Sequence, residues 1–240
     1  MAHYVKQDEA FKRFQSLFNA GEIAPNLYFF VRALDSGDTC IRWQYLRELG
    51  MCQSDGSFFR LMGSYRDYGS QVEEYKRGRV VQLVKETDKK GYRYRIVSSS
   101  VVNPAAKSTN AFGGASYHNY GAAVDLCLRT LGDSFARDTP VTVGGKQIAP
   151  NITAFYRDIG LLECASRHGI EWGGSWSDLW DMVHFQVKFL SLPSGDVWDY
   201  MCHWSYVAPK PKIVGLFPLL LGGLFYFLRG DKKSGNSRGV

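Results

Sequence analysis

The stretch SYHNYGAAVDLCL, residues 116–128, decides more of the expected fold than any other part of the chain. Its second half, 121–128, is an apolar run of the length of a buried strand. Asp125 lies inside that run, where a carboxylate costs free energy unless a partner compensates it. His118 precedes the run by a turn, so a loop leading into a strand can bring positions 118 and 125 to a common point. The stretch therefore predicts a buried strand whose acidic side chain needs a cationic partner.

A second polar group in an apolar setting occurs in DMVHF, residues 181–185. His184 has apolar neighbours on both sides, and Asp181 lies just before this short strand. Two imidazoles and one carboxylate suit zinc, and hydrolytic zinc sites combine three protein ligands with an open position. The sequence therefore predicts that His118, Asp125 and His184 bind one metal ion.

A general base is also required, because a hydrolytic site must move a proton from water to the leaving group. Asp181 is the first candidate, since it lies three residues before His184 and can reach the site without binding the metal. Asp178 and Glu171 are nearby alternatives, and spacing alone does not exclude either carboxylate.

The surrounding pattern mixes helices and strands without a strict alternation. Amphipathic periodicity predicts helices at 8–20, 41–49, 64–78 and 151–167. Short β-prone runs predict strands at 57–62, 93–102, 121–128, 170–174 and 182–187, and a hairpin at 141–148. Such a mixture indicates an α+β domain.

The composition indicates a basic globular protein. The chain has 240 residues, a 45% hydrophobic fraction and a formal net charge of +6. A basic balance favours anionic partners, including an anionic polymer such as a bacterial cell wall. The basic residues are scattered rather than gathered in a block, so nucleic acid is not an expected partner.

The cysteines predict neither a sulfur zinc site nor a disulfide framework. There are five, widely spaced and without a CxxC pair. We therefore expect synthesis in the reducing cytoplasm, and the polar N-terminus contains no apolar core of a signal peptide.

The run IVGLFPLLLGGLFYFL, residues 213–228, differs in kind because it carries no charge. As a helix it would extend roughly 24 Å at about 1.5 Å per residue, against about 30 Å of bilayer hydrocarbon. Trp204, Tyr206 and flanking cations resemble interfacial anchors. We expect this run to associate with a host or virion membrane; a buried helix or an oligomer contact is the alternative.

Three motifs together resemble a known family. Residues 116–125 match the pattern Ser-x-His-x-x-Gly-x-Ala-x-Asp at every fixed position. Residues 172–176 match Trp-Gly-Gly-x-Trp, and 181–185 match Asp-x-x-His-Phe. The chain resembles the zinc metallopeptidases that include D-Ala-D-Ala carboxypeptidases and L-alanyl-D-glutamate endopeptidases, in particular their phage endolysin-like branch. The resemblance spans about residues 57–188.

The resemblance implies a fold and a set of roles. The fold would be the LAS-type metallopeptidase fold, an α+β domain with a small central antiparallel sheet and flanking helices. The zinc ligands would be His118, Asp125 and His184, with Zn²⁺ as cofactor. Asp181 would be the catalytic acid and base.

A weaker match to the family, the Gly-x-Tyr-Arg turn at 63–66, implies residues that would hold the substrate. Arg66 would contact the substrate carbonyl or stabilise the developing oxyanion, which an arginine can do physically. Ser116 and Gln71 would bind the peptide stem, and Trp176 would line the cleft.

The implied function is a zinc-dependent peptidoglycan endopeptidase that cuts the stem peptide between L-Ala and D-Glu. It would act in bacterial cell-wall lysis, as a phage lysis enzyme or a virion-associated entry enzyme. The Trp-Gly-Gly-x-Trp run, typical of the endolysin branch, favours this activity over a D,D-carboxypeptidase on the same substrate. A non-catalytic, membrane-associated virion protein is an alternative of another class, disfavoured because every candidate ligand and Asp181 are present.

The expected organisation has three parts. Residues 1–50 would form an N-terminal helical extension packed on the core, residues 51–208 the peptidase domain, and residues 209–240 the hydrophobic segment and a polar tail. We expect a monomer that is made in the cytoplasm without a signal peptide and acts at the cell wall or in the periplasm, in contact with a membrane or virion.

Overall fold

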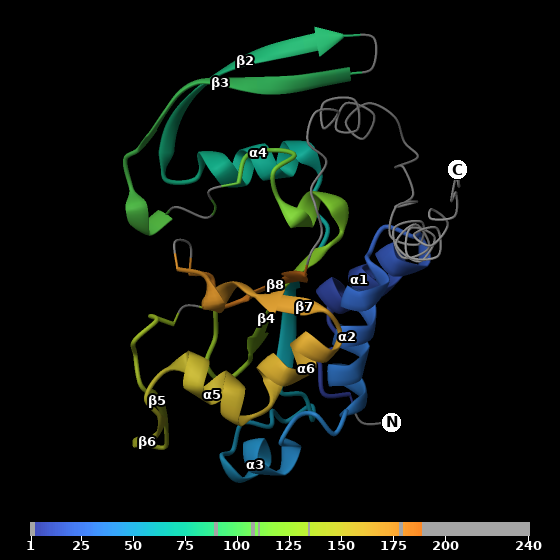
Figure 1. Ribbon diagram of the computed structural model, residues 1–240, viewed down its shortest axis with the longest axis vertical. Helices are drawn as coiled ribbons and strands as arrows, with labels where there is room; N and C mark the ends of the chain where they lie inside the picture. Colours follow the sequence, from blue (N-terminus) through green and yellow to red (C-terminus); the bar gives the residue numbers. More distant parts are fainter. Residues whose placement is uncertain are drawn as a thin grey trace, which may run out of the picture.

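The computed structural model describes residues 3–88, 91–106, 109, 111–133, 135–177 and 180–188 (Figure 1). Its centre is a four-stranded antiparallel sheet with the order β1-β4-β8-β7. The strands are β1 (Phe59–Gly63), β4 (Ala123–Leu128), β8 (His184–Val187) and β7 (Ile170–Trp172). The α+β class and the central antiparallel sheet expected from the sequence are therefore present.

Helices cover one side of this sheet. They are α1 (Glu9–Asn19), α2 (Pro25–Ser36), α3 (Trp43–Glu48), α5 (Ile152–Asp158) and α6 (Leu161–Arg167). Helix α1 contacts β1, α2 contacts β7 and β8, and α6 contacts β7 (Figure 1). Asp8 begins α1 by accepting a hydrogen bond from the Phe11 amide, which satisfies one of the free donors of the first turn.

The two faces of the sheet differ because side chains alternate along a strand. On β4, Val124, Leu126 and Leu128 are fully buried. Phe185 on β8 pairs with Val124 and lies 5.5 Å, ring to ring, from Phe30 of α2. The apolar face of the sheet therefore packs on the N-terminal helices, and the other face carries the polar side chains.

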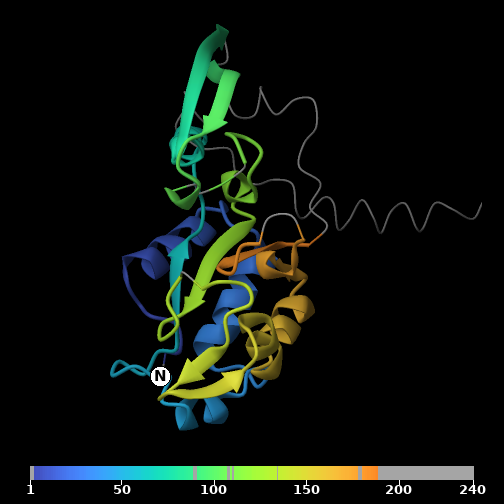
Figure 2. The same cartoon turned by 90° about the vertical axis from the view of Figure 1, so that its left-hand side faces the viewer.

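A second layer lies on the polar side. It contains α4 (Tyr68–Lys76) and a long hairpin of β2 (Arg79–Asp88) and β3 (Gly91–Val101). Figure 2 shows the hairpin projecting from one end of the molecule. The remaining elements are the 3-10 turns η1 (Pro104–Ala106), η2 (Tyr117–Tyr120) and η3 (Gly173–Ser175), and the small hairpin of β5 (Val141–Val143) and β6 (Lys146–Ala149).

Three elements differ from the sequence predictions. The single helix expected at 151–167 is two helices, α5 and α6, separated at Gly160. Gly160 has φ of 84°, which a glycine adopts without strain, and a Cβ there would overlap the Cys40 carbonyl oxygen. Helix α2 and strand β2 were not predicted at all. Helix α2 could have been found, because its buried residues Leu27, Phe30, Val31 and Leu34 recur at helical spacing. Strand β2 lacks a clean alternation, and its pairing with β3 decides its conformation.

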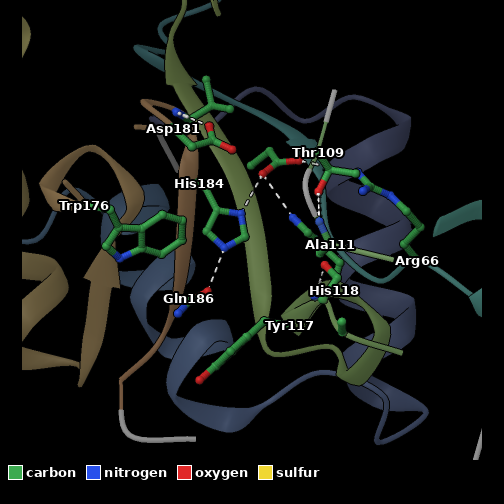
Figure 3. A pocket seen from close by; sticks show the side chains of 13 residues that line it. Arg66, Thr109, Ala111, Tyr117, His118, Trp176, Asp181, His184 and Gln186 are labelled. Atoms are coloured by element: carbon green, nitrogen blue, oxygen red, sulfur yellow. Dashed lines mark hydrogen bonds and ion pairs between the residues drawn. The ribbon is translucent and has the colours of Figure 1, made fainter. Parts of the chain in front are cut away.

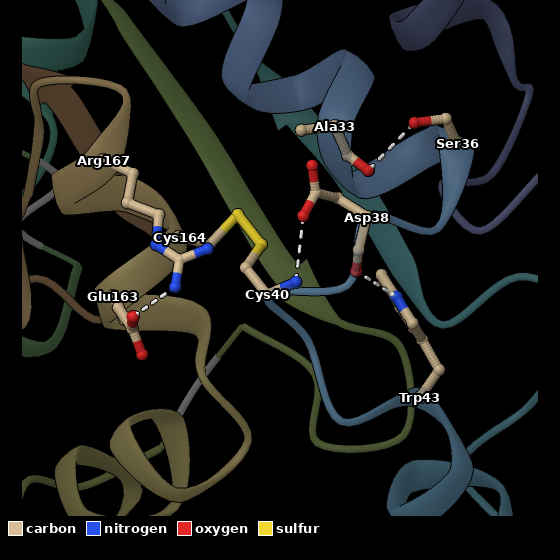
Figure 4. Close-up of a disulfide and its surroundings, with 8 residues drawn as sticks. All are labelled: Ala33, Ser36, Asp38, Cys40, Trp43, Glu163, Cys164 and Arg167. Atoms are coloured by element: carbon tan, nitrogen blue, oxygen red, sulfur yellow. Dashed lines mark hydrogen bonds and ion pairs between the residues drawn. A yellow bond between two sulfur atoms is a disulfide. The ribbon is translucent and has the colours of Figure 1, made fainter.

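A disulfide corrects the expectation drawn from the cysteines. Cys40 and Cys164 are bonded, with their Cα atoms 5.5 Å apart, although 124 residues separate them (Figure 4). The bond joins the segment after α2 to α6. The prediction was wrong because spacing along the chain carries no information on a pair that only the fold brings together.

The charge-free run 213–228 and the expected segment 209–240 lie outside the described residues. Within the described part of the chain, no helix has both the length and the apolar character needed to cross a bilayer.

Candidate metal centre

Two paired strands and one short turn bring the three predicted ligands together. Asp125 on β4 pairs directly with His184 on β8, so their side chains lie on the same face of the sheet. His118 lies in η2, which Ser116 caps by accepting a hydrogen bond from the His118 amide. Gly121 follows with φ of 62°, a left-handed conformation that turns the chain into β4.

The ligand atoms form a compact cluster (Figure 3). Nε2 of His118 lies 3.2 Å from Oδ1 of Asp125, and Nδ1 of His184 lies 3.4 Å from the same oxygen. One donor atom from each of the three residues lies within 4.8 Å of the others. The two rings meet edge to face with centroids 4.9 Å apart.

Hydrogen bonds on the outer side of each ring hold the imidazoles in place. Nδ1 of His118 lies 2.5 Å from the carbonyl oxygen of Ser64, so its Nε2 faces the cluster. Nε2 of His184 lies 3.0 Å from Oε1 of Gln186, so its Nδ1 faces the cluster. This is the usual arrangement of ligating histidines, whose outer nitrogen donates to a fixed oxygen.

The charge of Asp125 is strongly stabilised. Burial by itself raises the pKa of this carboxyl, but the imidazoles of His118 and His184 outweigh it and hold the pKa well below its usual range. A permanently ionised carboxylate beside two ring nitrogens is a donor set that fits Zn²⁺. Among the described residues, His118, Asp125 and His184 are the one group of at least three such side chains that could hold a metal ion.

A cavity of about 380 Å³ opens onto this cluster. Four further residues predicted for the site from the sequence are part of its wall: Arg66, Ser116, Trp176 and Asp181. Trp176 lies beside His184, with ring centroids 5.3 Å apart (Figure 3). The carboxylates of Asp125 and Asp181, the guanidinium of Arg66 and the ring of Trp176 thus surround one cavity.

Asp181 is the carboxylate that the structure places in the cavity wall beside Asp125. Its Oδ1 accepts a hydrogen bond from the Val183 amide at 3.3 Å. Burial, followed by the negative charge of Asp125, raises the pKa of Asp181. The alternative Glu171 is not part of the cavity wall and binds the amide of Gln186 instead; the other alternative, Asp178, lies outside the described residues.

Arg66 approaches the centre from the opposite side to the β8 strand. Its Nη2 lies 3.9 Å from Oδ2 of Asp125, and its Nη1 donates to Oε1 of Gln71 at 3.0 Å. Gln71 is fully buried and is not part of the cavity wall. Its own amide donates to the Ala111 carbonyl oxygen at 2.7 Å. The structure thus places Gln71 behind Arg66, where it orients the guanidinium rather than facing the open space.

The Trp-Gly-Gly-x-Trp run has a steric explanation. A Cβ at Gly173 would lie 2.8 Å from the Asp181 carbonyl oxygen and 3.1 Å from Cβ of His184. A Cβ at Gly174 would overlap the ring of Trp172. Gly173 therefore allows the η3 turn to pack directly against the segment that carries Asp181 and His184, and Gly174 leaves room for the ring of Trp172.

Sequence reasoning missed six residues of the cavity wall, of which three have polar side chains: Thr109, Tyr117 and Gln186. Gln186 could have been found, because it lies two residues after His184 in a predicted strand and therefore on the same face. Tyr117 lies between two motif positions and has no pattern of its own. Thr109 belongs to a segment without apolar periodicity, so only the fold brings it to the site.

Comparisons with known proteins agree with this geometry. A family model described as D-alanyl-D-alanine carboxypeptidase matches residues 109–187, which include the three clustered ligands and Asp181. The peptidoglycan L-alanyl-D-glutamate endopeptidase CwlK of Bacillus subtilis (strain 168) is 32% identical over 123 residues. That match covers 51% of this chain and 56% of CwlK, so the chain spans about half the length of this curated relative. Over residues 109–187 the chain is therefore similar to the peptidase family described as D-alanyl-D-alanine carboxypeptidase, and over 123 residues to a peptidoglycan L-alanyl-D-glutamate endopeptidase.

Proposed function

We propose that this protein is a zinc-dependent peptidase that cleaves the stem peptide of peptidoglycan between L-Ala and D-Glu. The observation that carries the proposal is the convergence of His118, Asp125 and His184 at the wall of a cavity that also contains Asp181. The bond is chosen because CwlK, the relative with 32% identity, is named for that cleavage.

The proposed ligands are Nε2 of His118, Nδ1 of His184 and the carboxylate of Asp125. Zinc bound there would supply a Lewis acid that polarises the scissile carbonyl and lowers the pKa of water. The remaining chemistry belongs to the protein's own side chains.

Asp181 is the proposed proton carrier. Oδ1 accepts the Val183 amide, so we assign the proton to Oδ2. Its raised pKa suits a group that must first accept a proton from water and then donate it to the leaving amine. From its place in the cavity wall, Asp181 would reach both the attacking water and the leaving amine.

Arg66 is proposed to stabilise the negative charge that develops on the carbonyl oxygen. Gln71 and the main chain at Ala111 hold the guanidinium in one orientation before substrate arrives. Such preorganised donors stabilise a transition state more than a ground state. Trp176 and Ser116, which line the same cavity, are proposed to contact the stem peptide.

A D,D-carboxypeptidase acting on the same polymer is the second candidate, because the matching family model carries that description. The two activities are separated by digesting purified cell walls and identifying the products by mass spectrometry. New D-Glu amino termini support the endopeptidase, whereas release of free D-Ala alone would refute it. Metal analysis of the purified protein in the same experiment tests the zinc assignment.

Replacing Asp181 with Asn tests the proposed proton carrier. We expect kcat to fall about 10²- to 10⁴-fold, because Asn cannot exchange a proton, while zinc content stays at the wild-type level. Asp158→Asn is the matched control, since Asp158 pairs with Arg42 on the surface and is not part of the cavity wall. Full wall-digesting activity in Asp181→Asn would show that another group moves the proton.

We further propose that the enzyme serves bacterial wall lysis, in a phage lysis or virion entry setting. The Trp-Gly-Gly-x-Trp run at 172–176 supports this setting, because it resembles the endolysin-like branch. Turbidity of wall suspensions from different hosts, measured with purified protein, tests it.

A further inference from the structure

We propose that Gln186, oriented by Glu171, is a positioning residue that makes His184 present Nδ1 to the metal site. The inference rests on the proposed zinc site and adds two residues to it. Neither residue belongs to the motifs that carry the family resemblance.

The direction of the hydrogen bonds follows from chemistry. A glutamate carboxylate accepts hydrogen bonds, so the group that faces Oε1 of Glu171 at 2.6 Å is the NH₂ of Gln186. The amide oxygen of Gln186 then necessarily faces His184, 3.0 Å from Nε2. Because that oxygen can only accept, Nε2 of His184 carries a hydrogen, and Nδ1 is the nitrogen that faces the proposed metal site.

The sheet register makes this chain of contacts possible. Glu171 on β7 pairs with Gln186 on β8, and Asp125 on β4 pairs with His184. Since residues two apart share a face, all four side chains lie in one row across three strands. The row begins at the carboxylate of Glu171, which is not itself part of the cavity wall, and ends at the carboxylate of Asp125 in the proposed metal site.

Burial makes the contacts effective. Gln186 is 9% exposed and His184 is 8% exposed, so water competes little for either group. A buried amide that lost Glu171 could rotate and present its NH₂ to His184 instead. Glu171 therefore acts on His184 only through Gln186, because it prevents the wrong orientation of the Gln186 amide.

His118 provides a comparison within the same site. Its outer nitrogen, Nδ1, faces the main-chain carbonyl of Ser64 at 2.5 Å, which no side-chain substitution removes. The two ligands therefore have opposite tautomers, with the hydrogen on Nδ1 in His118 and on Nε2 in His184. Only the tautomer of His184 depends on replaceable side chains.

The experiment uses the full chain, labelled with ¹⁵N-histidine, in wild-type form and in four variants. Gln186→Met keeps the side-chain length and removes the acceptor; Glu171→Met removes the anchor of the amide. The double variant Gln186→Glu with Glu171→Gln exchanges the two groups and keeps both hydrogen bonds and the net charge. Gln82→Met, on the hairpin away from the site, is the matched control.

Two readouts are measured. Long-range ¹H–¹⁵N spectra of the metal-free protein report the tautomer of each ring, and the chain has only five histidines. Chelator competition reports zinc affinity. For Gln186→Met we expect loss of the Nε2–H state at His184 and about 10- to 100-fold weaker zinc binding. We expect Glu171→Met to lose less zinc affinity than Gln186→Met, and the exchanged pair to regain near wild-type zinc affinity and the wild-type His184 tautomer. His118 should keep its tautomer in all variants.

The outcomes separate the inference from the proposed function. Zinc binding by the wild type together with unchanged affinity and an unchanged His184 tautomer in Gln186→Met would overturn the inference alone. A wild type that binds no zinc would overturn the proposed function and the inference with it. Failure of the exchanged pair to recover, with a wild-type thermal unfolding curve, would also count against the positioning role.

Discussion

At the scale of single residues, the site depends on how Asp125 remains charged. Burial opposes its ionisation, and the two imidazoles reverse that effect. Arg66, with Nη2 3.9 Å away, adds a positive charge on the other oxygen. Because both imidazoles lower the pKa of Asp125, removing either one would weaken the stabilisation of its charge, so the three groups act as a coupled unit.

A different carboxylate gives a pH prediction that does not involve the site. Asp55 accepts hydrogen bonds from Ser57 and Arg129, which together lower its pKa from 3.8 to about 2. Because the folded pKa lies below the unfolded one, the stabilisation is complete above about pH 4. It is lost as the pH falls from 3.8 towards 2.

Asp55→Asn tests this prediction. We expect the wild type to be more stable than the variant at pH 7, with the difference shrinking as the pH falls towards 2. Urea unfolding at several pH values measures both free energies. A difference that stays constant over that range would contradict the assignment.

At the scale of elements, the η3 turn and strand β8 form one unit. The Gly173 carbonyl oxygen accepts hydrogen bonds from the amides of Asp181 and Trp176, both at 3.2 Å. The Trp172 indole donates to the Met182 carbonyl oxygen at 2.7 Å. These contacts hold the segment that leads into β8, and therefore position both Asp181 and the first residue of the strand, His184.

Gly173→Ala tests the close packing of this unit. The new Cβ would lie 2.8 Å from the Asp181 carbonyl oxygen, so the segment must move. We expect a loss of about 1–3 kcal/mol in the free energy of unfolding and weaker zinc binding, measured by thermal unfolding and chelator competition.

The matched control is Gly69→Ala in α4. A Cβ at Gly69 meets its nearest atom, Oδ1 of Asp67, at an ordinary 3.4 Å, and alanine favours a helix over glycine. This variant should be as stable as the wild type or more so, with unchanged zinc affinity. Equal behaviour of the two variants would argue against steric packing at Gly173.

At the scale of the whole molecule, the sheet joins parts that are distant in the sequence. Its apolar face packs on α1 and α2, its polar face carries the site, and the disulfide joins the segment after α2 to α6. The N-terminal helices therefore supply part of the core of the sheet. The division of the chain at residues 50 and 208 stays a prediction.

Removing the disulfide between Cys40 and Cys164 tests how much this bond stabilises the fold. For Cys40→Ala with Cys164→Ala we expect a loss of about 2–4 kcal/mol in the free energy of unfolding, since the bond closes a long loop. Thermal unfolding with and without reductant measures it. Reductant should lower the stability of the wild type to that of the variant and leave the variant unchanged; an equal effect on both would contradict the prediction.

The charge-free run 213–228 gives a prediction outside the described residues. Deleting residues 213–240 should move the protein from the membrane fraction to the soluble fraction, because the apolar run and the cations that follow it are removed together. Fractionation followed by immunoblotting measures the shift. Unchanged partitioning would argue against a membrane anchor.

Much of the site could be predicted because several of its residues are polar groups within apolar segments. Asp125 and His184 are polar groups in apolar strands, and each strand assigns its side chains to faces by a period of two. Gly160 shows the opposite case. Its helical surroundings predict one long helix, but Gly160 is left-handed with φ of 84°. The nearby Cys40 carbonyl oxygen leaves no room for a Cβ at that position, a contact invisible in the sequence.

The sequence by itself determined the three candidate metal ligands, the strand that carries Asp125 and the α+β class, since these depend on residue type and short-range periodicity. Only the tertiary structure decided that Cys40 bonds Cys164, that Gln71 lies behind Arg66, and that Glu171, which is not part of the cavity wall, binds Gln186. These are contacts between segments far apart in the chain or across paired strands. Their geometry depends on how the sheet and helices pack, and local patterns carry no information about that packing.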